Sequence, residues 1–61
     1  MQSEQQIKDG LAECKAEIKK AAKELYEASL SDNYEKMADC MGFLTVGISA
    51  TIAINEILKD E

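Results

Sequence analysis

A repeating spacing of apolar residues in the first half of the chain is the feature that most constrains its fold. Between residues 3 and 29, apolar or small residues recur at alternating intervals of four and three, which places them along one side of an α-helix. This first seam consists of Ile7, Leu11, Cys14, Ile18, Ala21, Leu25 and Ala28. Ser3 and Gln6 match the capping box that begins many helices. The pattern predicts an amphipathic helix over about residues 3–29.

The same spacing recurs in the second half, where apolar residues also occur outside the seam. The second seam consists of Met37, Cys40, Leu44, Gly47, Thr51, Ile54 and Leu58. Further apolar residues lie on other sides of the same helix, namely Met41, Phe43, Val46, Ile48, Ala50, Ile52 and Ile57. No charged residue occurs from Cys40 to Asn55. The pattern predicts a helix over about residues 34–59 that is buried on most sides, with Asp32 and Glu35 as its capping box.

The uncharged run has two alternative interpretations. A membrane span needs about 20 predominantly apolar residues, whereas this run is shorter and contains Thr45, Ser49 and Asn55. A β-strand would fit the alternation of apolar residues between Leu44 and Ile54. Nothing else in the chain resembles a partner strand, and a lone strand would leave both edges unpaired. A buried helix is therefore the favoured interpretation.

The turn between the two helices sets how they are arranged. Ser31, Asp32 and Asn33 are residue types that favour turns, so we expect a turn over residues 30–33. So short a connection makes the helices antiparallel neighbours. The expected fold class is all-α, with one helical-hairpin domain over residues 1–61. Because so short a chain gives only a marginal core, two hairpins are expected to assemble as a four-helix bundle dimer.

Composition argues against several functional classes. The chain has no His, and its two cysteines, Cys14 and Cys40, cannot complete a zinc site, so we expect no metal, no cofactor and no catalytic residue. The two thiols are expected to be reduced core residues. A net charge of -5 disfavours binding to nucleic acid and to membrane surfaces. Binding of RNA would need a lysine face such as Lys15, Lys19 and Lys23, and Glu residues are expected to interrupt this row. The polar N-terminus lacks a signal peptide, so a cytoplasmic location is expected.

The apolar residues of the second segment suggest what the chain does. One neighbouring helix cannot cover them all, and uncovered apolar patches mark interaction sites. We therefore expect a small non-enzymatic protein–protein interaction module, with no small-molecule substrate, that binds itself or another helical protein. The expected interface consists of Met41, Phe43, Leu44, Val46, Ile48, Ile52, Ile54 and Ile57.

Two resemblances suggest more specific roles. The segments 11–14 and 49–61 resemble parts of the small hairpin co-chaperones of type III secretion needle subunits. That resemblance implies a co-chaperone or adaptor that buries the same face on a partner protein's helix. In architecture the chain is also similar to a plasmid-encoded two-helix regulator that binds RNA. The length and composition of the chain are also compatible with a small phage- or plasmid-type regulator.

Overall fold

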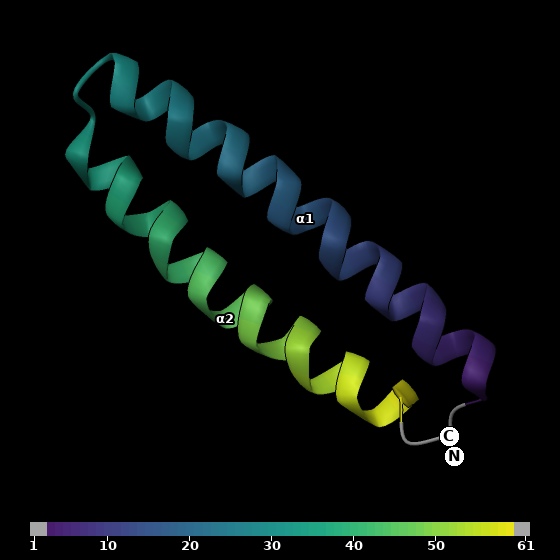
Figure 1. The fold of residues 1–61 in the computed structure, drawn as a ribbon. Coiled ribbons are helices and arrows are strands. Elements are labelled where there is room, and N and C mark those ends of the chain that lie inside the picture. Colours follow the sequence, from purple (N-terminus) through teal and green to yellow (C-terminus); the bar gives the residue numbers. More distant parts are fainter. Residues whose placement is uncertain (1–2, 60–61) are drawn as a thin grey trace.

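The computed structural model describes residues 3–59 as two antiparallel helices joined by a tight turn (Figure 1). Helix α1 spans Glu4–Leu30 and helix α2 spans Tyr34–Lys59. The two helices pack side by side in a rod that measures 44 × 16 × 15 Å. The predicted all-α hairpin is confirmed, and both helices begin and end within about one residue of the predicted bounds.

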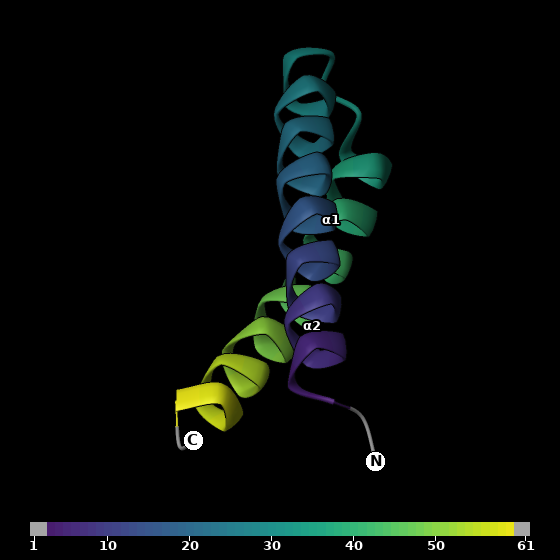
Figure 2. The same ribbon diagram turned by 90° about the vertical axis from the view of Figure 1, so that its right-hand side faces the viewer.

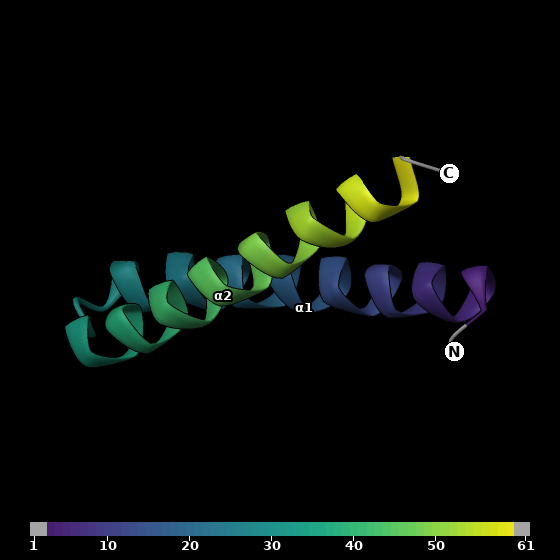
Figure 3. The same cartoon turned by 90° about the horizontal axis from the view of Figure 1, so that it is seen from below.

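The two helices are not parallel along their whole length. Figures 2 and 3 show that α2 crosses α1 obliquely, so that the end of α2 lies away from the start of α1. The helices are close together near the turn and separate toward their other ends.

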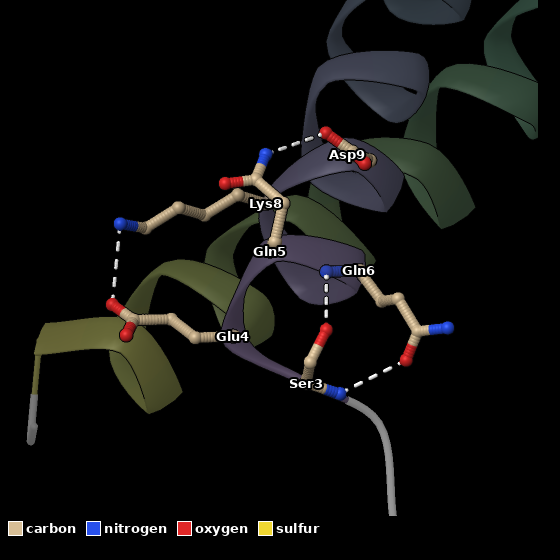
Figure 4. Close-up of polar contacts among 6 residues, drawn as sticks. All are labelled: Ser3, Glu4, Gln5, Gln6, Lys8 and Asp9. Atoms are coloured by element: carbon tan, nitrogen blue, oxygen red, sulfur yellow. Dashed lines mark hydrogen bonds and ion pairs between the residues drawn. The ribbon is translucent and has the colours of Figure 1, made fainter.

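The predicted capping box at the start of α1 is confirmed (Figure 4). The backbone N–H of Gln6 donates to Ser3 Oγ at 3.2 Å, and the backbone N–H of Ser3 donates to Gln6 Oε1 at 2.9 Å. One turn further on, Lys8 Nζ lies 3.2 Å from Glu4 Oε1. This ion pair is exposed, so it contributes little to stability, whereas the cap satisfies a backbone donor that the helix leaves free.

The prediction that Asp32 caps α2 is wrong. Asp32 has φ 54°, in the left-handed region, whereas an N-cap residue has extended backbone. Its N–H donates to Ser29 O and that of Asn33 to Ala28 O, a pairing known as the Schellman motif, which ends α1. Asn33 caps α2 instead, because its Oδ1 accepts from the N–H of Lys36 at 3.3 Å.

The two predicted seams form the contact between the helices. All fourteen seam positions are buried or half-buried, and the fully buried ones are Leu11, Ala21, Ala28 and Cys40. Gly47 allows a close approach, because a Cβ built there would lie 3.2 Å from Ile18 Cγ1. Cys14 is half-buried, and both thiols are free, as expected.

Candidate protein interaction surface

Six of the eight residues predicted to form an interface are exposed on α2. The exposed fractions are 56% for Met41, 50% for Phe43, 70% for Val46, 45% for Ile48, 58% for Ile52 and 55% for Ile57. Leu44 and Ile54 are half-buried, since they belong to the second seam and face α1. Of the predicted interface, the part available to a partner therefore consists of the six exposed side chains.

These six residues form two stripes on opposite sides of the second seam. Each residue turns the helix by about 100°, so a residue just before a seam position lies on one side and a residue just after it lies on the other. Phe43 and Ile57 come just before Leu44 and Leu58, and Val46 is one turn from Phe43. The other stripe begins with Met41 and Ile48, which follow seam positions, and continues to Ile52.

On α1, the residues that border the two stripes differ in charge. Glu17 and Glu24 come just before seam residues, whereas Lys8 and Lys15 come just after them. In an antiparallel pair of helices, residues just before the seam on both helices share one side of the hairpin. A groove of about 540 Å³ shows this directly, because Glu17 and Glu24 line it together with Phe43.

The hairpin therefore has an acidic flank and a basic flank. The acidic flank combines the apolar stripe Phe43, Val46 and Ile57 with Glu13, Glu17, Glu24, Glu27 and Asp39, and it also carries Lys20 and Lys36. The basic flank combines the stripe Met41, Ile48 and Ile52 with Lys8, Lys15, Lys19 and Lys59. Within residues 3–59, no Asp or Glu occupies a position of the basic flank, although Glu4 pairs with Lys8 at its end.

A smaller hollow of about 340 Å³ lies at the C-terminal end of the basic flank. Ile52 and Lys59 line it together with Asn55, and Glu56 from the outer side of α2 also borders it. This hollow places the Lys59 side chain beside the apolar stripe of the basic flank. The combination of an apolar floor and a charged rim is typical of surfaces that bind other proteins.

The arrangement of charges corrects one expectation from the sequence. Glu13, Glu17 and Glu24 were expected to interrupt the lysine row. For Lys15 and Lys19 this is not so, because both project about 100° or more away from these glutamates around α1. The first seam separates Glu17 from Lys15, since one precedes Ile18 and the other follows Cys14. Lys15 and Lys19 therefore lie together on the basic flank, whereas Lys23 lies on the outer side of α1, one turn from Glu27.

By length and composition, α2 could also cross a membrane. It contains an 18-residue window that is apolar enough, and 6% of that window is buried in the hairpin. Across the part of the chain that the structure describes, no group of three or more His, Cys, Asp or Glu side chains could hold a metal ion. The groove beside Phe43 brings together carboxylates, lysines and the buried Cys40.

Comparisons with protein-family models, curated proteins and solved structures find no match to this chain. The function is therefore inferred from the geometry and charge of the surface.

Proposed function

We propose that this protein is a non-enzymatic protein–protein interaction module that associates with itself through α2. In the simplest arrangement two hairpins pack with their second helices at the centre, which makes a four-helix bundle. The observation that carries the proposal is the exposure of six large apolar side chains on one helix, each at least 45% accessible to solvent. Apolar patches of this kind mark binding surfaces in soluble proteins.

The total surface of the hairpin supports association. The accessible surface is 4819 Å². A compact folded chain of 6.7 kDa is expected to expose about 3,900 Å². The hairpin thus exposes about 900 Å² more than a compact chain, close to the roughly 800 Å² per partner that a standard interface buries. One additional hairpin could cover an excess of this size.

The hairpin architecture favours a protein partner over a lipid bilayer. Helix α1 is as long as α2 and runs antiparallel beside it, with charged residues along most of its exposed side. If α2 crossed a membrane as part of this hairpin, Lys15, Glu17 and Lys19 would enter the hydrocarbon core. Such charges are costly in a bilayer, so membrane insertion would require the two helices to separate.

Nucleic acid is a poor fit for the whole molecule, because the net charge of -5 opposes contact with phosphates. A helix from another protein could occupy the same apolar stripes, as the resemblance to hairpin co-chaperones implies. Such a partner would leave the isolated chain monomeric, so the two forms of the proposal give different results for the pure protein.

Sedimentation equilibrium of the pure chain at micromolar concentration tests self-association. We expect a mass of at least two chains, and a helical monomer would refute the proposal in favour of a foreign partner. The double variant Val46→Glu/Ile52→Glu should become monomeric, since it places a charge in each apolar stripe. Ser49→Glu adds a charge on the outer side of the same helix, so this control should keep the mass of the unmodified chain.

A further inference from the structure

We propose that copies of the chain associate head-to-tail, with the basic flank of one hairpin packed against the acidic flank of the next. This inference rests on the proposed self-association and specifies which surfaces meet. The hairpin has two apolar stripes, on opposite sides of the second seam. Helix α1 places glutamates beside one stripe and lysines beside the other.

The charges distinguish this arrangement from a twofold one. A twofold contact brings the same flank of both copies together, so the acidic flank with Glu17 and Glu24 would meet a second acidic flank, or the two lysine-bearing flanks would meet each other. Like charges that face each other across an interface disfavour association. A head-to-tail contact instead brings the lysines of one copy toward the glutamates of the next.

Both flanks carry exposed apolar side chains. Large apolar side chains that are 45–70% exposed lie on each flank: Phe43, Val46 and Ile57 on one, and Met41, Ile48 and Ile52 on the other, which also carries the exposed Tyr26 and Tyr34. Along α2, small residues continue each stripe at intervals of three and four: Ala50 and Ala53 lie between Val46 and Ile57, and Thr45 lies between Met41 and Ile48. Both surfaces are therefore apolar, and their rims are opposite in charge.

Head-to-tail contacts differ from twofold contacts in how far assembly proceeds. Two hairpins joined in this way make a four-helix unit, but one basic flank and one acidic flank remain uncovered. Further copies can add until the assembly closes into a ring, or they can continue as a filament. We therefore expect the unmodified chain to form assemblies larger than a dimer.

A mixing experiment with two variants tests the inference. Phe43→Glu blocks the acidic flank and Ile48→Lys blocks the basic flank, in both cases by adding a charge of the sign already present. Each variant alone lacks one of the two surfaces that a contact needs, so each should be monomeric by sedimentation equilibrium. An equimolar mixture should form a heterodimer, because each variant supplies the flank that the other lacks.

Circular dichroism of the same samples covers the case in which a variant is unfolded alone. Recovery of helicity on mixing would then report the same contact. If one variant alone keeps the mass of the unmodified chain, or if mixing produces no heterodimer, head-to-tail packing is wrong while self-association remains. If the unmodified chain is itself monomeric, self-association fails and the inference fails with it.

The role of the rim charges has its own test in the same mixture. Adding Glu17→Lys and Glu24→Lys to the Ile48→Lys variant should weaken the heterodimer by at least tenfold, since both glutamates border the contact. Asp9→Lys changes a charge on the outer side of α1 and should leave the affinity within twofold. Equal affinities for the glutamate variant and this control would overturn the electrostatic argument.

Discussion

The conformation of Asp32 leads to a prediction about the stability of the hairpin. Its φ of 54° lies in the left-handed region, where a Cβ approaches the following carbonyl oxygen at a cost of about 1–2 kcal/mol. Asp tolerates this region better than most residues, and glycine occupies it without strain. The position is C′ of the Schellman motif, where helices most often have glycine. Replacement of Asp32 by Gly should therefore stabilise the protein.

The size of the effect follows from two opposing contributions. Glycine removes the Cβ strain but loses more conformational freedom on folding, about 0.5–1 kcal/mol. The hydrogen bond from Tyr34 Oη to Asp32 Oδ1 is exposed and 3.5 Å long, so its loss costs little. The negative charge of Asp32 lies between the end of α1, whose dipole disfavours it, and the start of α2, whose dipole favours it. These two effects oppose each other, so loss of the charge should change the stability little. We expect a net stabilisation of about 0.5–1 kcal/mol from relief of the strain.

Thermal unfolding followed by circular dichroism measures this gain. For a domain of this size, 1 kcal/mol corresponds to about 4–8 °C in Tm, so Asp32→Gly should raise Tm by about 2–8 °C. Protein concentration must be held fixed, since association also shifts Tm. Asp32→Ala is the matched control and should melt below the unmodified chain, because it keeps the Cβ and tolerates the left-handed region less well than Asp. A glycine variant that melts at or below the unmodified chain would refute the reasoning.

Three further predictions concern the helices and the thiols. Gly10→Ala should raise the free energy of unfolding by about 0.5–1 kcal/mol, since a Cβ there meets nothing within 4 Å. Gly47→Ala should gain less, because its Cβ would crowd the opposite helix. A larger rise in Tm for Gly47→Ala than for Gly10→Ala would contradict this ranking. Asn33→Ala should lower stability by about 1 kcal/mol through loss of the α2 cap, as measured by urea denaturation. A thiol reagent should modify the half-buried Cys14 before the buried Cys40, and equal rates would show that the hairpin opens during labelling.

The seams could be predicted from the sequence because the spacing of apolar residues along the chain indicates which side of a helix is buried. Residues at intervals of three and four share a side of a helix whatever the rest of the chain does, and Ile7 through Ala28 keep that spacing for three heptads. The two seams have similar length and flank a single turn, so they can cover each other only in an antiparallel pair. The hairpin follows from these two facts together.

The turn was harder to predict at the level of single residues. Ser31, Asp32 and Asn33 all favour turns and caps, so composition does not decide which residue takes the left-handed conformation and which caps α2. The packing of the two helices against each other determines the conformation of each turn residue. The helices must leave the turn with their seams facing each other, and the structure meets this requirement with Asp32 in the left-handed region and Asn33 as the cap.

The division into acidic and basic flanks needs the register of both helices, because a single helix does not define which of its edges will share a side with Phe43. Once the seams are fixed, Glu17 and Glu24 border Phe43, and Lys15 borders the other stripe. Stability of the hairpin does not require this sorting, since exposed ion pairs contribute only about 0–1 kcal/mol each and mixed charges on both edges would serve equally well. A contact between copies does benefit from it, because complementary rims favour head-to-tail packing and oppose twofold packing of either flank. Under the proposed self-association, the segregation of charge would have a physical role that it lacks in the isolated hairpin.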